Sequence, residues 1–385
     1  MKSAGVVHLV GAGPGDPGLL TVRGRELLEQ AEVIVYDGLV NTDLLRFANP
    51  RAEIIYGGKH DRARAVPQET LTALLIAQAR LGKRVVRLKG GDPYVLGRGG
   101  EEALRLAEAG VPFEVVSGVS SAQAVLNYAG IPLTHRDYCS SFTVITGHED
   151  PTRQESRLDW ARLAQAPGTL VILMGLTHLR EISRLLLEHG RPPKTPAALI
   201  RWGTTGRQKV ITGTLSSIAD RAELARLQPP VTIVVGEVVN LRDRLNWFEK
   251  GALFGQRVVL TQPRTQVEAL AAPLQRRGAD VLCVMSDPDD TAAARTRFLE
   301  EGADWVIFAN APDLQRFRQR FDLGQLARQF PHLKFAVLEP GTRARLEALG
   351  VPVALEAPAP TAEALVQALE SCRALELETP GAGPG

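Results

Sequence analysis

Five glycines stand close together in the segment between residues 85 and 102. Residues 85–88 predict a buried strand, and helix-forming residues resume at Glu101. The glycines between them are Gly90, Gly91, Gly97, Gly99 and Gly100. Each glycine carries a large conformational-entropy penalty, so the run favours a place where the backbone approaches a ligand or adopts positive φ. Because α/β proteins place their sites in such strand-to-helix loops, we predict that this loop is one wall of a small-molecule site.

A second glycine loop, residues 11–18, follows a strand predicted at residues 6–10. Its glycines fit the G-x-G-x-x-G dinucleotide fingerprint, and Asp37 ends the next predicted strand, where it could grip the ribose of NAD. Pro14 and Pro17 count against this interpretation, because they remove backbone N–H donors from a loop that should bind pyrophosphate. An NAD-dependent oxidoreductase therefore stays open as an alternative.

The composition is that of an ordinary soluble protein. In 385 residues, 44% are hydrophobic and 23% are charged, which predicts two or three globular domains. The net charge of +2 argues against bulk nucleic-acid binding. Cys139, Cys283 and Cys372 lack metal-ligand spacing, so no metal site is expected. Without a signal peptide or a membrane-length apolar run, we expect a cytoplasmic protein with no membrane partner.

Alternating strands and helices predict an α/β fold with three successive sheets. In the first part, strands are expected at 6–10, 31–36, 54–55, 85–88 and 113–116, in a mostly parallel sheet. From residue 138 the expected strands are 142–146, 169–173, 197–200, 209–214 and 231–235, and they form a mixed sheet.

After a predicted hinge at residues 249–252, the alternation restarts. Strands are expected at 258–261, 280–285, 305–309, 334–338 and 353–356, which fits a small C-terminal flavodoxin-like α/β domain. Residues 374–385 are expected to be a disordered tail, because glycine, proline and alanine dominate their end.

Three separated segments resemble the signatures of the uroporphyrinogen-III C-methyltransferases, which belong to the S-adenosylmethionine-dependent tetrapyrrole methylases. They are residues 10–18, 89–102 and 133–138, and the likeness extends over residues 5–248. The resemblance implies the two-domain tetrapyrrole methylase fold, with an N-terminal α/β domain at 1–137 and a second at 138–248. It also implies a homodimer and an S-adenosylmethionine molecule between the two domains.

The resemblance also implies which residues contact S-adenosyl-L-methionine, the methyl donor. Ser120 and Ser121 stand where the family has Thr-Ala, so the first hydroxyl is kept and the second is added. Met174 could be a core residue, but its glycine neighbour and its place at a strand end favour the site. The full set of expected cofactor contacts is Pro14, Gly90, Gly91, Asp92, Val95, Ser120, Ser121, Met174 and Gly203.

For catalysis, the resemblance implies Asp37 as proton acceptor and Lys59 as proton donor. Capping of a helix is the structural alternative for Asp37. The implied substrate, uroporphyrinogen III, carries carboxylates that arginine can grip in a bidentate manner. The candidate substrate-binding residues are therefore basic: His60, Arg62, Lys89, Arg98, His135 and Arg136. We interpret residues 99–102 as mostly structural.

The C-terminal third resembles uroporphyrinogen-III synthase at residues 255–264, 304–308 and 360–365. The likeness covers only about half of one lobe of that two-lobed enzyme. Ala309, Asn310 and Ala311 also replace the hydroxyl residues that would bind the substrate's carboxylates. We therefore predict a partial, inactive synthase-like domain at residues 255–373.

The leading hypothesis is methylation of uroporphyrinogen III to precorrin-1 and precorrin-2, for sirohaem or cobalamin biosynthesis. Besides the oxidoreductase, two alternatives remain. One is a methyltransferase acting on a later corrin intermediate, and the other is a non-catalytic tetrapyrrole carrier, suggested by the incomplete C-terminal domain.

Overall fold

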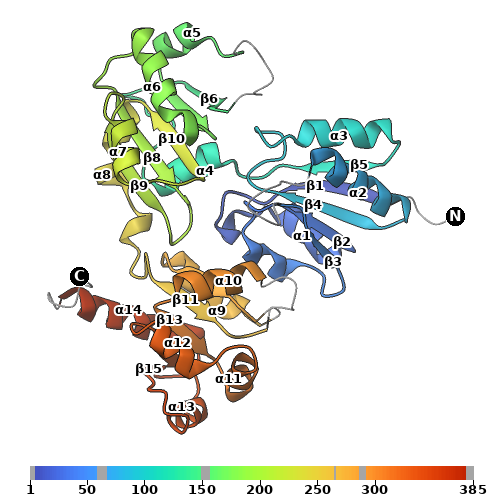
Figure 1. Ribbon diagram of the computed structural model, residues 1–385, viewed down its shortest axis with the longest axis vertical. Helices are drawn as coiled ribbons and strands as arrows, with labels where there is room; N and C mark the ends of the chain where they lie inside the picture. Colours follow the sequence, from blue (N-terminus) through green and yellow to red (C-terminus); the bar gives the residue numbers. More distant parts are fainter. Residues whose placement is uncertain (1–4, 59–66, 149–156, 264–265, 286–291, 379–385) are drawn as a thin grey trace. The chain divides into compact units, whose positions relative to one another are not determined.

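The computed structural model describes residues 5–58, 67–148, 157–263, 266–285 and 292–378 (Figure 1). The chain divides into two compact units. Unit 1 comprises Met1–Leu27, Val35–Val40 and Tyr56–Glu249, and unit 2 comprises Leu28–Ile34, Asn41–Ile55 and Lys250–Gly385. Three predicted site residues, Lys59, His60 and Arg62, lie outside the described residues.

The first sheet has five strands in the order β3-β2-β4-β1-β5. Strand β1 pairs in parallel with β4 on one side and with the edge strand β5 on the other, as the alternation of strands and helices predicted. Each expected strand is present, within a few residues of its predicted ends. The strands are β1 Val6–Gly11, β2 Val33–Tyr36, β3 Glu53–Tyr56, β4 Arg84–Lys89 and β5 Phe113–Val116.

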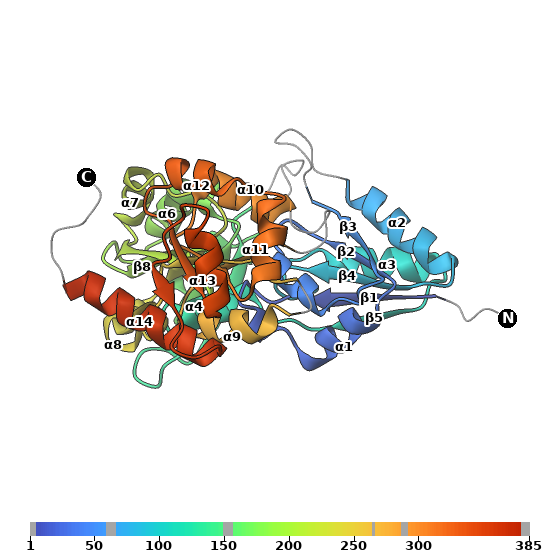
Figure 2. The same ribbon diagram turned by 90° about the horizontal axis from the view of Figure 1, so that it is seen from below.

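Helices cover both faces of this sheet. Figures 1 and 2 show α2 and α3 on one side and α1 on the other. Apart from the partly buried Val6, the apolar residues of β1, β2 and β4 are buried between these layers, which explains their near-continuous hydrophobic runs. The helical segments are η1 Pro17–Leu19, α1 Val22–Gln30, η2 Thr42–Phe47, α2 Gln68–Arg80 and α3 Gly99–Glu108.

The second sheet is mixed, in the order β6-β7-β10-β8-β9. Strands β6 and β7 are parallel, while β10 runs antiparallel to both β7 and β8, so the predicted mixture is confirmed. The strands are β6 Phe142–Thr146, β7 Thr169–Leu173, β8 Pro196–Arg201, β9 Lys209–Thr214 and β10 Val231–Val235.

Two sets of helices enclose the second sheet. Helices α5 Trp160–Gln165, α6 Leu179–Glu188 and α7 Ile218–Leu224 share one apolar core with it. On the other face lies α4, Ser121–Tyr128, whose Val125 and Leu126 pack against residues of β7, β8 and β10. A helix that precedes the second sheet in sequence thus completes its core. The remaining short segments are η3 Leu176–His178, η4 Glu237–Leu241, α8 Arg242–Leu245 and η5 Phe248–Lys250.

The third sheet has the order β12-β11-β13-β14-β15, and its strands pair in parallel. Helices α10 to α13 pack on one face, and α9 and α14 pack on the other. The strands are β11 Arg257–Leu260, β12 Asp280–Cys283, β13 Trp305–Phe308, β14 Lys334–Val337 and β15 Leu355–Glu356. The helices are α9 Glu268–Arg276, α10 Ala292–Glu301, α11 Ala311–Arg318, α12 Leu323–Gln329, α13 Pro340–Glu347 and α14 Ala362–Glu378. Helix α14 continues beyond residue 373, so residues 374–378 of the expected tail are helical.

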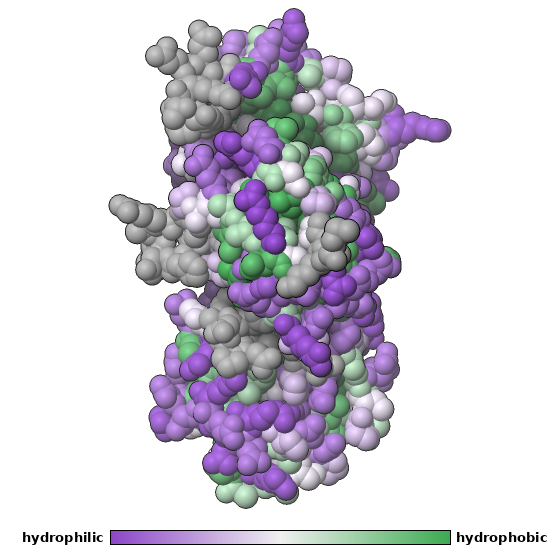
Figure 3. All heavy atoms as spheres, turned by 90° about the vertical axis from the view of Figure 1, so that its right-hand side faces the viewer, coloured by the Kyte–Doolittle hydropathy of each residue, from purple (hydrophilic) through white to green (hydrophobic). Residues whose placement is uncertain are grey.

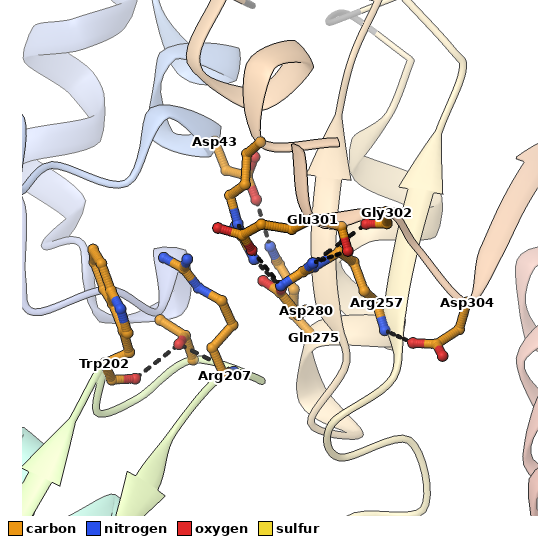
Figure 4. Close-up of polar contacts among 11 residues, drawn as sticks. Asp43, Trp202, Arg207, Arg257, Gln275, Asp280, Glu301, Gly302 and Asp304 are labelled. Atoms are coloured by element: carbon orange, nitrogen blue, oxygen red, sulfur yellow. Dashed lines mark hydrogen bonds and ion pairs between the residues drawn. The ribbon is translucent and has the colours of Figure 1, made fainter. Parts of the chain in front are cut away.

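Arg257 ties together the starts of three strands in the third sheet (Figure 4). Its Nε lies 2.9 Å from Asp280 Oδ2, and its backbone N–H donates to Asp304 Oδ2 at 2.6 Å. These charges lie at the amino ends of the strands, opposite the carboxyl ends where parallel sheets bind ligands. We therefore interpret the cluster as structural.

Hydrophilic residues make up much of the face drawn in Figure 3, with smaller hydrophobic patches among them. Within the described part of the chain, no helix combines the length and apolar character needed to cross a membrane. The same residues contain no group of three or more His, Cys, Asp or Glu side chains that could hold a metal ion.

Candidate functional site

Three strands of the first sheet lead into glycines that touch one another. Gly11 ends β1, Gly91 follows β4 and Gly118 follows β5. A Cβ atom on Gly118 would lie 2.2 Å from the Gly91 carbonyl oxygen, and one on Gly11 would lie 2.4 Å from the Gly118 Cα. No larger residue fits at Gly11 or Gly118, so the loop backbones meet directly at the carboxyl edge of the sheet. We call these three residues the glycine junction.

Hydrogen bonds fix the loops around the glycine junction. The N–H of Gly91 donates to the Gly13 carbonyl at 2.8 Å, and the N–H of Gly13 donates to the Gly91 carbonyl at 3.2 Å. The Asp92 carboxylate accepts from the Gly118 N–H at 3.0 Å and from the Tyr94 N–H at 2.8 Å. Both predicted glycine loops therefore belong to one hydrogen-bonded edge, which carries Pro14, Gly91 and Asp92.

The predicted serines lie at the same edge. A Cβ on Gly91 would lie 3.8 Å from the Ser121 N and 3.9 Å from the Ser120 Cα. Ser120 caps α4, its Oγ accepting from the Ala122 N–H at 3.3 Å. A Cβ on Gly90 would lie 3.3 Å from the Leu39 Cβ, two residues beyond Asp37, so Gly90 links this edge to the end of β2.

In the second sheet, the two predicted cofactor contacts Met174 and Gly203 lie in loops where non-glycine residues have positive φ. Met174, which follows β7, has φ +58° and a half-exposed side chain, and Trp202 and Thr204 on either side of Gly203 have φ +48° and +70°. Positive φ is unfavourable for non-glycine residues, above all for a β-branched one, and such strain gathers at functional sites. In Figure 4, Arg207 lies beside Trp202, its guanidinium carbon 4.0 Å from the ring centroid.

Contacts inside unit 1 join the strained loop to the first glycine loop. The Asp16 N–H donates to Thr204 Oγ1 at 3.0 Å, and a Cβ on Gly15 would lie 2.9 Å from that oxygen. A Cβ on Gly203 would lie 2.5 Å from Val125 Cγ1 in α4, so close packing already requires a glycine at this position. The structure thus brings Gly203 to the same loop as Pro14.

Tyr128 adds a second link to this loop. Its hydroxyl donates to Asp16 Oδ2 at 2.7 Å, and Asp16 Oδ1 accepts from the Gly18 N–H at 2.7 Å. Burial, followed by the nearby Asp16 charge, raises the pKa of Tyr128, so the hydroxyl keeps its proton and remains a donor. Asp16 and Tyr128 are far apart in sequence, and no spacing or motif pointed to them.

Asp37 lies directly after β2 and is held by a buried arginine. Arg87 Nη2 lies 2.6 Å from Asp37 Oδ1, while Arg87 Nε donates to Glu102 Oε1 at 3.1 Å. Lys89 Nζ lies 3.1 Å from Glu102 Oε2. The Arg87, Lys89 and Glu102 side chains are nearly inaccessible to solvent, whereas that of Asp37 is partly exposed. The helix-capping alternative is therefore not needed to explain Asp37, whose described partner is Arg87.

Among the predicted substrate residues that the structure describes, Lys89 is buried, whereas Arg98, His135 and Arg136 are not. Burial and then the neighbouring Arg87 lower the pKa of Lys89, and Glu102 opposes this effect. Arg98 is exposed, has φ +59° and pairs with Glu101 through its Nη2 at 2.6 Å. His135 and the exposed Arg136 lie in a turn in which His135 Nδ1 accepts from the Asp137 N–H at 3.2 Å.

Arg87 and Glu102 were missed by the sequence reasoning, although one signal was available. Arg87 and Lys89 stand on either side of Leu88 in the buried part of β4, so both side chains point to the same buried face. Buried cations require an anion, and Glu102 is the anion that α3 supplies.

The chain matches the family model of the tetrapyrrole (corrin/porphyrin) methylases over residues 6–219. It is 44% identical over 278 residues to a uroporphyrinogen-III C-methyltransferase of Bacillus subtilis (strain 168), a match that covers 72% of this chain and 57% of that protein. It is 51% identical over 244 residues to a siroheme synthase of Edwardsiella ictaluri (strain 93-146), covering 63% of this chain and 52% of that protein.

A solved structure, the uroporphyrin-III C-methyl transferase of Thermus thermophilus complexed with S-adenyl homocysteine, superposes with a TM-score of 0.53 at 40% identity. The match covers 61% of this chain and 99% of that one. The chain thus spans about half the length of the curated relatives it matches, but nearly the whole of this solved structure.

Proposed function

Because the chain belongs to the tetrapyrrole (corrin/porphyrin) methylase family, we propose that it is an S-adenosylmethionine-dependent methyltransferase acting on uroporphyrinogen III. The proposed product is precorrin-2, formed through precorrin-1, for sirohaem or cobalamin. Two matched proteins support the assignment: a relative named uroporphyrinogen-III C-methyltransferase, and the homologue solved with S-adenyl homocysteine.

The observation that carries the proposal is the glycine junction at the carboxyl edge of the first sheet. S-adenosylmethionine contains no phosphate, so it is suited by closely packed peptide groups, a carboxylate and apolar side chains. Asp92 provides the carboxylate, and the half-exposed Val95 and Met174 provide apolar surface. We propose that these residues hold it: Pro14, Gly90, Gly91, Asp92, Val95, Ser120, Ser121, Met174 and Gly203.

Methylation of a pyrrole carbon is mainly a positioning task for the protein. Bound S-adenosylmethionine supplies an electrophilic methyl group. The loops at the sheet edge must hold the macrocycle in line with it and exclude water. In the proposed mechanism Asp37, held by Arg87 at 2.6 Å, accepts the proton that the macrocycle loses, and Lys59 donates a proton.

The proposed substrate carries carboxylates, and basic side chains would bind them. Arg98, His135 and Arg136 have side chains that reach solvent, and His60 and Arg62 complete the set. Lys89 stays in the proposed set, and its ammonium pairs with Glu102 at 3.1 Å. A homodimer and a cytoplasmic location are further parts of the proposal.

For the C-terminal region we propose a flavodoxin-like domain derived from half of a uroporphyrinogen-III synthase, without synthase activity. The strand order β12-β11-β13-β14-β15 supports the flavodoxin-like assignment, because it corresponds to 2-1-3-4-5 within the domain. After β13 the chain continues with Ala309, Asn310 and Ala311, and the Asn310 side chain is occupied in capping α11.

Two measurements test the proposed function. Isothermal titration calorimetry should detect S-adenosylhomocysteine and not NAD⁺; binding of NAD⁺ alone would favour the oxidoreductase. Transfer of a labelled methyl group from S-adenosylmethionine should then be followed on uroporphyrinogen III and on later corrin intermediates. We expect label in uroporphyrinogen III, and label only in a later corrin would move the activity to that substrate.

A further inference from the structure

A chain of buried charges leads from Asp37 into the interior of the first sheet's helical layer. Arg87 connects two carboxylates through two different nitrogens of its guanidinium, with Nη2 at 2.6 Å from Asp37 and Nε at 3.1 Å from Glu102. The guanidinium is planar and rigid, so fixing Nε against Glu102 also fixes the position of Nη2. The position of the Asp37 carboxylate therefore depends on where Glu102 is held.

Glu102 is held from several directions. It lies in the first turn of α3, and its carboxylate pairs with Lys89 as well as Arg87. Gln68, the first residue of α2, donates its side-chain N–H to the same Oε1 that Arg87 contacts. Two helices and strand β4 thus meet at one carboxylate that is completely buried.

Stability alone does not explain this arrangement. Burying a carboxylate and two cations carries a large desolvation penalty, and well-packed apolar residues of similar volume are often equally or more stabilising. The network also includes the one partly exposed carboxylate at the end of β2, Asp37, to which the proposed function gives a proton-transfer role. The buried charges can therefore serve to hold the Asp37 carboxylate in one position.

We propose that Glu102 is a positioning residue for Asp37, acting through Arg87. Glu102 touches neither substrate nor cofactor in this role. It holds the Arg87 guanidinium so that the Asp37 carboxylate stays at the edge of the sheet, and it neutralises Lys89, which would otherwise compete for Asp37. The inference rests on the proposed function for the identity of the reaction, and on the contacts above for the positioning.

A double-mutant cycle between Glu102 and Asp37 tests the inference in the full-length protein. Glu102→Gln keeps the shape, but the amide has one acceptor oxygen and can satisfy only one of the two cations. We expect kcat for methyl transfer to fall about tenfold, with the Kd for S-adenosylhomocysteine unchanged within about twofold. Asp37→Asn should lower kcat by about 100-fold.

The decisive variant combines both changes. If Glu102 acts through Asp37, adding Glu102→Gln to Asp37→Asn lowers kcat no further, whereas a merely structural role makes the two losses multiply. The matched control is Glu108→Gln on the same helix, which removes an exposed pair with Arg105 and should leave kcat unchanged. Multiplying losses, or wild-type kcat in Glu102→Gln, would overturn the inference.

Two further readouts keep the test independent of folding and of the reaction. Arg87→Lys retains the positive charge but removes the planar guanidinium that contacts both Asp37 and Glu102. It should therefore reproduce the kcat loss expected of Glu102→Gln, even if the Glu102→Gln protein is unstable. A crystal structure of Glu102→Gln should place Asp37 Oδ1 beyond about 3.5 Å from Arg87 Nη2. An unchanged Asp37 in that crystal refutes the positioning, whereas an inactive wild-type enzyme refutes only the proposed function.

Discussion

His8 is a buried histidine of β1, and Glu114 lies opposite it on the paired strand β5. Its Nδ1 lies 3.0 Å from Glu114 Oε2, and Arg23 of α1 pairs with the same carboxylate. Burial lowers the pKa of His8 below its ordinary value of 6.5; Glu114 opposes this effect, and Arg23 and Arg84 add to it. Folded His8 is therefore harder to protonate than the same residue in the unfolded chain.

The lowered pKa of His8 makes the folded protein less stable at acidic pH. Below pH 6.5 the unfolded chain binds a proton that folded His8 binds less readily, so the free energy of unfolding falls as the pH drops from 6.5 toward the lowered pKa. His8→Gln should reduce this loss. Chemical denaturation of both proteins at about pH 7.5 and pH 5.5 measures it, and an equal pH dependence would contradict the assignment.

Tyr128 contributes a hydrogen bond on which the first glycine loop depends. Tyr128→Phe removes the donor to Asp16 and leaves that carboxylate without a buried partner, which should cost about 1–3 kcal/mol of stability. Because Asp16 also contacts Thr204 and Gly18, we expect S-adenosylhomocysteine affinity to weaken by about tenfold, measured by calorimetry. Unchanged affinity in a folded Tyr128→Phe protein would show that the loop is fixed without this bond.

At the scale of the elements, the loops that follow β1, β4 and β5 approach one another so closely that they require glycine at Gly11 and Gly118. Gly118→Ala would place a methyl group 2.2 Å from the Gly91 carbonyl oxygen and should destabilise the protein by about 1–3 kcal/mol. Gly100→Ala is the matched control, because no atom lies within 4 Å of its Cβ position, at an exposed place in α3. Alanine there should be neutral or stabilise by up to about 1 kcal/mol.

Denaturant midpoints and S-adenosylhomocysteine titrations of the two alanine variants measure the difference. Loss of S-adenosylhomocysteine binding in both proteins would mean that binding does not depend specifically on the glycine junction, because Gly100 in α3 lies outside it. Loss in Gly118→Ala alone supports the glycine junction as the site.

Helices and strands could be predicted from the sequence where a local residue pattern is enough to determine the secondary structure. The runs of Val, Ile and Leu located the strands, and glycines after β1 and β4 indicated the sheet edge at which the site is proposed, because the carboxyl ends of parallel strands meet. The pattern could not tell which of Glu101 and Glu102 faces inward. Both begin a helix, and only the packing of α3 against β4 buries Glu102 and leaves Glu101 exposed with Arg98.

Contacts between distant segments were the part that no pattern could supply. Asp16 meets both Tyr128 and Thr204 because α4 packs under the second sheet, and that packing is a property of the folded unit. The strained conformations of Trp202 and Thr204 are likewise imposed from outside, since their own sequence prefers other backbone angles.

At the scale of the whole molecule, the question is whether methylation needs the C-terminal domain. The second sheet has apolar cores on both of its faces, and the third sheet has two apolar cores of its own. The solved Thermus thermophilus enzyme is matched over 99% of its length by 61% of this chain, and the family model matches residues 6–219. We therefore expect a truncation that lacks residues 255–385 to keep its kcat and its S-adenosylhomocysteine affinity within about twofold.

The truncation should nevertheless lose some stability. Residues 28–34 and 41–55 cluster with the C-terminal region in unit 2, so removing residues 255–385 takes away part of their packing. Differential scanning calorimetry should show a lower Tm for the truncated protein, while the methyl-transfer assay at a temperature well below that Tm shows full turnover. A folded truncation that binds S-adenosylhomocysteine but no longer methylates uroporphyrinogen III would assign the C-terminal domain a part in the reaction, because neither misfolding nor loss of the cofactor could then explain the lost step.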